Sequence, residues 1–212
     1  MNLMDYLIDR YGYDEPIFSE ELSQDLNKMN PSTMRQYLKR LVDSGELYRY
    51  KDGIFFIPNP NSYLKKKTLS VTKIINKKYI YNNNETIGYV TGISFANSLQ
   101  LTTQNPGMVE IVTNKETNRS RIVNFNKRKV GLRRPRVEVN ESNYKLLQVL
   151  DLLNNYESLT FKPIEEVNEK ITKYLKETDF KRELINECLS NYPTKAANRF
   201  WESGLYNELT LQ

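Results

Sequence analysis

Apolar residues recur at helical spacing over residues 31–43, between two signals that mark the ends of a helix. Asn30 predicts the N-cap, Pro31 suits the first turn, and Gly45 predicts a left-handed exit. The apolar positions form a single stripe, made by Met34, Leu38, Leu41 and Val42. Taken alone, the pattern indicates an ordinary amphipathic helix with a solvated polar side.

The polar side of this expected helix carries donors that suit a DNA groove. These positions are Ser32, Thr33, Arg35, Gln36, Lys39 and Arg40. Residues 18–26 predict a second helix, capped by Ser19. Four residues, 27–30, separate its end from the start of the helix over residues 31–43. That spacing is typical of a helix-turn-helix.

A hairpin signal follows the expected recognition helix. Two runs with high β propensity flank the pair Asp52-Gly53. The first run carries Arg49, Tyr50 and Lys51, which suit contacts to phosphate and sugar. Helix, turn, helix and basic hairpin in this order predict a winged helix-turn-helix domain.

The expected fold class is α+β, with a domain boundary at the proline-containing turn of residues 58–62. We expect a winged helix-turn-helix DNA-binding domain over residues 1–60 and a linker over residues 61–68. A mixed domain over residues 69–212 should follow. It should hold a helix near residues 69–80, an entry turn at residues 88–92, a small antiparallel sheet between residues 108 and 132, and C-terminal helices. We expect those helices over residues 144–153, 163–175, 180–189 and 193–203, the first capped by Asn140 or Ser142.

Composition narrows the possible chemistry. The chain has 212 residues, of which 39% are hydrophobic and 27% charged, so we expect a packed core. It has no histidine and one cysteine, which excludes a histidine triad, a histidine-ligated metal and an internal disulfide. Cys188 lies in an expected helix and should be a buried apolar residue. We expect a soluble, cytoplasmic protein with no metal, no cofactor and no membrane span.

The net charge of +5 conceals a basic middle segment. Residues 65–136 carry 15 Lys and Arg against 3 Asp and Glu, whereas both flanking segments have an acidic excess. Eight basic residues crowd together on or beside the expected hairpin: Arg119, Arg121, Lys127, Arg128, Lys129, Arg133, Arg134 and Arg136. Polyanion binding and a solvated surface facing the acidic helices explain this basic block equally well.

Several segments together resemble the AbiEi family, the antitoxins and transcriptional repressors of AbiE abortive-infection systems. They are the helix-turn-helix with its hairpin, the segments 88–92 and 101–106, the strand 109–113 that leads into the basic hairpin, and the helix start at residues 143–151. The resemblance implies that the N-terminal domain binds double-stranded DNA at inverted repeats in its own promoter. It implies that the C-terminal domain counters a nucleotidyltransferase-like toxin. In such type IV systems the two proteins need not form a stable complex.

We expect no enzyme activity and place the antitoxic role on the basic block. One alternative is a metal-dependent nuclease that uses the block 119–136 as a substrate groove. Such a site needs converging carboxylates, and residues 65–136 offer only Glu85, Glu110 and Glu116. The other alternative is an RNA-binding protein with a basic β-surface, although the common aromatic stacking signature is lacking.

Overall fold

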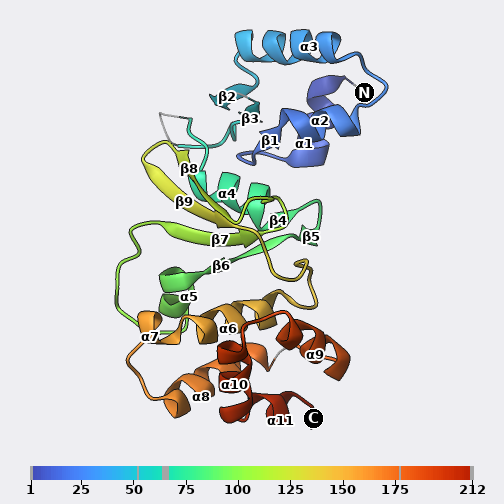
Figure 1. The fold of residues 1–212 in the computed structure, drawn as a ribbon. Helices are drawn as coiled ribbons and strands as arrows, with labels where there is room; N and C mark the ends of the chain where they lie inside the picture. Colours follow the sequence, from blue (N-terminus) through green and yellow to red (C-terminus); the bar gives the residue numbers. More distant parts are fainter. Residues whose placement is uncertain (1, 52, 64–66, 177, 211–212) are drawn as a thin grey trace. The chain divides into compact units, whose positions relative to one another are not determined.

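The computed structural model describes residues 2–51, 53–63, 67–176 and 178–210. The chain forms two compact units, Met1–Lys77 and Lys78–Gln212, and combines helices with small sheets (Figure 1). The expected α+β class is therefore confirmed. The expected linker, residues 61–68, includes residues 64–66, which lie outside the described residues.

The N-terminal unit combines helices with a three-stranded antiparallel sheet of order β1-β3-β2. Its elements are α1 (Leu3–Tyr11), β1 (Ile17–Phe18), α2 (Ser19–Asp25), α3 (Pro31–Asp43), β2 (Tyr48–Lys51) and β3 (Ile54–Phe56). The core is formed by apolar side chains from the helices and the sheet that pack against one another. Its buried residues are Leu7, Ile17, Leu22, Met34, Leu38, Leu47, Phe55 and Ile57.

Two of the expected helix boundaries in this unit are confirmed and one is wrong. The Asn30 side chain accepts from the backbone N–H of Ser32 at 2.9 Å, and Gly45 has a φ of 78°. Ser19, however, is the first helical residue, and the N-cap is Phe18. Strand β1 explains the difference, because its pairing with β3 holds residue 18 in an extended conformation. The hairpin residue Asp52 lies outside the described residues.

The N-terminal unit extends beyond residue 60 to include most of α4 (Val71–Tyr79). The ammonium group of Lys73 donates to the carbonyl oxygen of Asp14 at 3.0 Å, and that of Lys77 to the carbonyl oxygen of Pro16 at 2.8 Å. Contacts from α4 therefore stabilise the loop that leads into β1.

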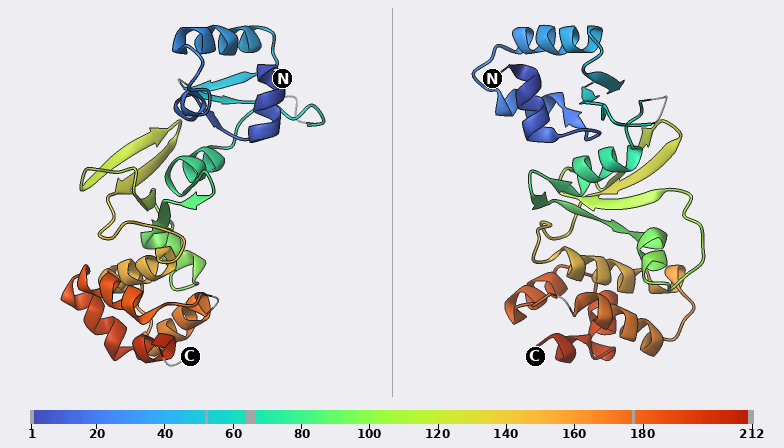
Figure 2. Two further views of the ribbon diagram at one scale, coloured as in Figure 1. Left: turned by 90° about the vertical axis from the view of Figure 1, so that its right-hand side faces the viewer. Right: turned by 180° about the vertical axis from the view of Figure 1, so that it is seen from behind.

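The second unit is built on a four-stranded sheet of order β6-β7-β9-β8 (Figure 2). Its strands are β6 (Gly88–Thr91), β7 (Val109–Thr113), β8 (Ser120–Phe125) and β9 (Arg128–Arg133), and β4 (Tyr81–Asn82) and β5 (Glu85–Thr86) form a separate pair. The expected antiparallel pairing holds for β6 with β7 and for β8 with β9, whereas β7 and β9 run parallel.

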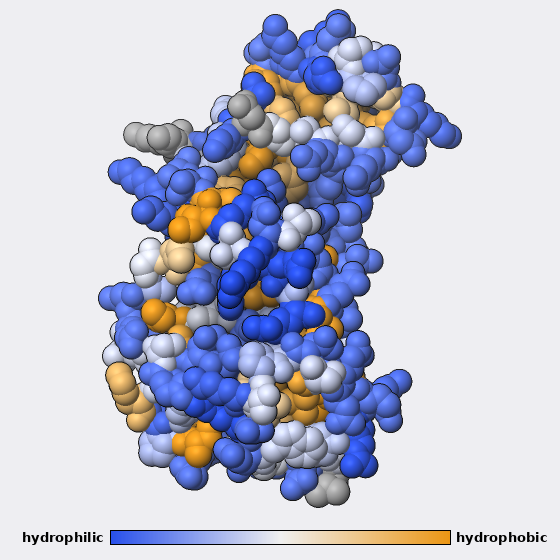
Figure 3. Space-filling view, viewed as in Figure 1, coloured by the Kyte–Doolittle hydropathy of each residue, from blue (hydrophilic) through white to orange (hydrophobic). Residues whose placement is uncertain are grey.

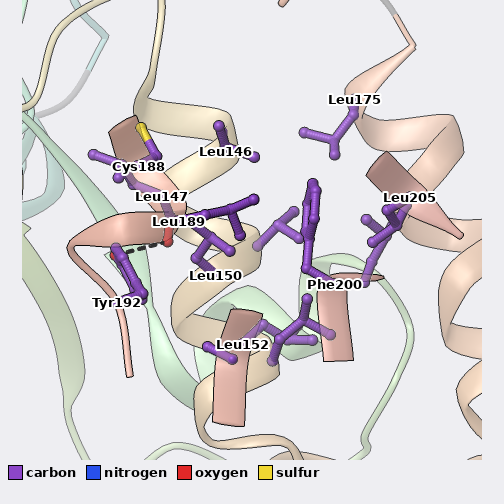
Figure 4. Packing of buried hydrophobic residues seen from close by; sticks show 14 of the residues in the cluster. Leu146, Leu147, Leu150, Leu152, Leu175, Cys188, Leu189, Tyr192, Phe200 and Leu205 are labelled. Atoms are coloured by element: carbon purple, nitrogen blue, oxygen red, sulfur yellow. Dashed lines mark hydrogen bonds between the residues drawn. The ribbon is translucent and has the colours of Figure 1, made fainter. Parts of the chain in front are cut away.

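Helices fill the rest of this unit. They are α5 (Gly92–Ser98), α6 (Tyr144–Asn154), α7 (Tyr156–Leu159), α8 (Ile164–Leu175), α9 (Arg182–Ser190), α10 (Thr194–Glu202) and α11 (Leu205–Thr210). Helix α6 is central: every residue from Leu146 to Leu153 is buried, and α8, α9, α10 and β6 pack around it. Figure 4 shows its leucines beside Cys188 and Phe200, with Leu205 on the far side of Phe200 in the same cluster. Helix α6 is thus buried on all sides from Leu146 to Leu153, and its buried polar residues Gln148 and Asp151 need hydrogen-bond partners inside the core.

Two sequence-based expectations for the second unit are wrong. Residues 88–91 form strand β6 rather than a turn, because Tyr89 and Val90 pair with β7 and Gly88 permits close backbone approach. A Cβ atom at Gly88 would lie 2.1 Å from the carbonyl oxygen of Tyr79. The N-cap of α6 is Asn143, and Asn140 instead accepts from the backbone N–H of Ser142 at 3.0 Å in the preceding turn.

Within the described part of the chain, no helix is both long enough and apolar enough to cross a lipid bilayer.

Candidate nucleic-acid interface

Helix α3 divides its residues between the core and the surface as its pattern predicts. Met34 and Leu38 are buried at 4% and 3% exposure. The six expected DNA-contacting residues of the helix are all exposed: Ser32, Thr33, Arg35, Gln36, Lys39 and Arg40. The Arg40 guanidinium lies 5.8 Å from the centroid of the Tyr37 ring, on the same exposed side. The structure therefore presents these donors together on one side of a helix that the core holds in place.

The hairpin β2–β3 supplies the other expected contacts. Along β2, Arg49 and Lys51 are exposed, whereas Tyr48 and Tyr50 are half-buried. The pairing with β3 shifts register between Arg49 and Lys51, so regular alternation is interrupted there, and both basic side chains reach the surface. The guanidinium of Arg49 lies 5.8 Å from the centroid of the Phe55 ring in β3, which restricts its position.

A groove of about 610 Å³ separates α3 from the sheet in this unit. Its basic lining comes from Arg35, Lys39 and Arg49, and its apolar lining from Met34, Leu38, Val42 and Phe55. Figure 3 shows apolar surface directly beneath the polar outer side of α3. Both the helix and the hairpin therefore direct cationic side chains toward one concave surface.

The basic block of the second unit does not form one continuous face. Cross-strand pairing aligns Arg121 with Leu132 and Asn124 with Lys129. Partners in a pair project to the same side, so Arg121 and Lys129 lie on opposite sides of the sheet. Lys127, Arg128 and Lys129 lie at the exposed turn between β8 and β9.

The acidic residue Glu116 neutralises one member of this block. Its carboxylate pairs with Arg121 and accepts from the backbone N–H of Asn118 at 3.0 Å. Burial pushes the pKa of Glu116 upward, but the hydrogen bonds from Arg121 and the backbone outweigh it, so the pKa is lowered. Glu116 thereby fixes the loop that precedes β8 and carries Arg119.

The remaining four arginines meet at a single pocket, which we call the arginine pocket. It has a volume of about 770 Å³, and its basic lining is Arg119, Arg133, Arg134 and Arg136. Figure 3 shows strongly hydrophilic side chains where the chain leaves β9 and runs toward α6. The structure thus brings together half of the expected basic block. Arg119 comes just before β8 in the chain, whereas the other three arginines lie at or just after the end of β9.

The floor of the arginine pocket was not predicted from the sequence. Asp151 of α6 is 5% exposed and accepts hydrogen bonds from Tyr89 Oη at 3.2 Å and Arg133 Nη2 at 3.2 Å. Burial raises the pKa of Asp151, and the charge of Arg133 opposes that rise. The hydroxyl groups of Tyr192 and Tyr89 lie 3.3 Å apart. The available signal was an aspartate within the apolar run 146–153.

Comparison of the sequence with models of known protein families and with curated proteins gives no match. Among the described residues, no three or more Cys, Asp or Glu side chains come close enough together to hold a metal ion. The antitoxin, nuclease and RNA-binding interpretations thus stay predictions.

Proposed function

We propose that this protein is a DNA-binding repressor of its own promoter and that its N-terminal unit is a winged helix-turn-helix. The exposed polar side of α3 carries the proposal, because six donors lie on a helix whose other side is buried. The element order helix, strand, helix, helix, strand, strand also supports it.

Each part of the site suits a different part of a duplex. Arg35 and Gln36 lie in the first half of α3, which is the end that reads base edges in helix-turn-helix complexes. Arginine matches guanine and glutamine matches adenine in the major groove. In this proposal Lys39, Arg49 and Lys51 contact phosphates, which fix the register of the protein on the duplex.

Binding to the DNA upstream of the gene tests this proposal. Arg35→Ala and Gln36→Ala should each lose roughly 1–3 kcal/mol of discrimination between the promoter and unrelated DNA. Lys51→Ala should instead weaken binding to the promoter and to unrelated DNA equally, because a phosphate contact carries no sequence information. Arg10→Ala is the matched control, since Arg10 is an exposed α1 residue paired with Asp25. Unchanged promoter binding in both α3 variants would refute the proposal.

We further propose that the second unit acts as the antitoxin of an AbiE-like, type IV system. The resemblance to the AbiEi family is the basis for this role. Its support in the structure is a separately packed unit with exposed cationic residues, including those at the β8–β9 turn. The proposal requires a neighbouring nucleotidyltransferase-like gene whose expression arrests growth.

Charge reversal at the β8–β9 turn separates the two roles. The variant Lys127→Glu, Arg128→Glu, Lys129→Glu should lose toxin rescue while promoter repression persists. These residues are exposed, so circular dichroism should show an unchanged fold. Full rescue by this variant would exclude the turn from antitoxicity, and an unrelated neighbouring gene would contradict the antitoxin role itself.

A further inference from the structure

The arginine pocket has an uncompensated positive charge. Its lining includes four arginines and one acidic residue, Asp151. Within the described residues, Arg119, Arg134 and Arg136 have no carboxylate at ion-pair distance, whereas Arg133 pairs with Asp151 at 3.2 Å and also lies 4.0 Å from the carboxylate of Glu110. Like charges gathered at one concave surface repel one another unless an anion or solvent offsets them. The pocket is therefore suited to an anionic ligand with more than one charge.

Two of the four arginines, Arg133 and Arg136, are held in place by neighbouring side chains. Arg133 Nη2 lies 3.2 Å from the buried Asp151 carboxylate and 3.5 Å from the hydroxyl of Thr91. The guanidinium of Arg136 lies 5.5 Å from the centroid of the buried Tyr192 ring. Asp151 already accepts hydrogen bonds from tyrosine, threonine and arginine donors. Asp151 is thus a positioning residue that orients Arg133. It does not itself contact the ligand, which the arginines bind.

The type of cation and the size of the pocket narrow the ligand class. Guanidinium groups form paired, parallel hydrogen bonds to phosphate oxygens, which a single ammonium group does not. A volume of about 770 Å³ lies within the range of small-molecule sites and exceeds what a single phosphate would fill. Val112 and Pro135 supply apolar wall next to the arginines, which suits the packing of a base or sugar.

We propose that the arginine pocket binds a nucleotide, with Arg119, Arg134 and Arg136 on its phosphate chain. A concave site lined by four arginines favours a compact polyphosphate over a long duplex, which would instead contact the exposed β8–β9 turn. This site is independent of promoter recognition by α3, since all its residues belong to the second unit.

Calorimetric titration of the full chain tests the proposal. The probes are ATP, GTP, inorganic tripolyphosphate and adenosine, in buffer without Mg²⁺ so that the phosphates keep their charge. At least one of the two nucleotides should bind more tightly than tripolyphosphate, and adenosine should not bind. Arg134→Gln/Arg136→Gln should weaken nucleotide binding by about tenfold or more, because two charge-assisted contacts are lost.

The matched control is Lys127→Gln/Lys129→Gln, which removes the same charge at the β8–β9 turn. It should change nucleotide affinity by less than about twofold if the pocket geometry decides binding. No binding of either nucleotide would overturn the proposal, as would equal weakening in both double variants. Equal affinity for tripolyphosphate and for both nucleotides would overturn the assignment of a nucleoside. Tighter binding of a single-stranded oligonucleotide than of either nucleotide would assign the pocket to nucleic acid instead.

Discussion

The ammonium group of Lys77 lies 2.9 Å from the carboxylate of Glu21, which is almost completely buried. The same ammonium group lies 4.5 Å from the centroid of the Tyr11 ring. Lys77 thus connects α4 to α1 and α2 within the N-terminal unit. An acidic residue in such a place requires a cation, because an ionised carboxylate without a partner is costly to bury.

Removal of Lys77 should therefore destabilise the N-terminal unit. We expect Lys77→Ala to lower its free energy of unfolding by about 2–4 kcal/mol, because Glu21 loses its charge partner. Lys73→Ala is the matched control and should cost less than about 1 kcal/mol, since the Lys73–Glu15 pair is exposed. Hydrogen exchange of peptides from residues 1–77 measures both. Equal protection in the two variants would show that the Lys77–Glu21 pair contributes nothing special.

Gly88 should tolerate no side chain. A Cβ atom there would lie 2.1 Å from the carbonyl oxygen of Tyr79 and 2.5 Å from that of Val112. Since these two carbonyl oxygens belong to the backbone of α4 and β7 and cannot swing aside as a side chain can, Gly88→Ala should cost about 3 kcal/mol or more. Gly107→Ala meets no atom within 4 Å and should change stability little. Urea unfolding followed by Trp201 fluorescence compares them, and similar midpoints would contradict the packing described for β6.

The Cys188 thiol should be inert in the folded protein. It is fully buried against α6, and burial raises its pKa to about 12. Iodoacetamide at neutral pH should therefore modify Cys188 only after urea unfolds the second unit. Rapid modification of the native protein would mean that α9 opens far more often than this core implies.

Asp151 should make stability depend on pH in a particular direction. Burial raises its pKa in the folded state, so the folded protein binds a proton more readily than the unfolded chain does. This contribution to stability is present below the unfolded pKa and is lost as the pH rises through the raised folded pKa. Relative to Asp151→Asn, the wild type should thus gain stability as the pH falls toward the ordinary aspartate pKa of about 4. Urea unfolding at each pH measures this difference. If the free energies of unfolding of the wild type and Asp151→Asn change with pH in the same way, this account is contradicted.

Local patterns in the sequence predicted the elements that depend on local interactions. Helix α3 has its capping Asn30 and its Gly45, and the C-terminal helices have clear apolar periodicity. Strand β6 was missed because Gly88 and Gly92 are typical of a turn, and only pairing with β7 makes residues 88–91 a strand. Strand β1, with two residues, is too short to produce a pattern.

The candidate sites divide in the same way. The α3 contacts follow from helical spacing alone, because one side of the helix must be buried. The arginine pocket does not follow from any local pattern, since its floor joins Asp151 to Tyr89, which lies 62 positions earlier in the chain. Strand alternation also could not reveal which arginines converge, because Arg119, Arg134 and Arg136 lie outside the strands.

The dependence of promoter binding on salt concentration tests the central claim most directly. If α3 and the hairpin grip a duplex, log affinity should fall linearly with log salt, and the slope should decrease by about 1 for each phosphate-contacting cation removed. We therefore expect Lys39→Ala/Lys51→Ala to reduce the slope by about 2, and Arg10→Ala to leave it unchanged. If the wild type, Lys39→Ala/Lys51→Ala and Arg10→Ala all have the same slope, DNA binding through this unit is contradicted.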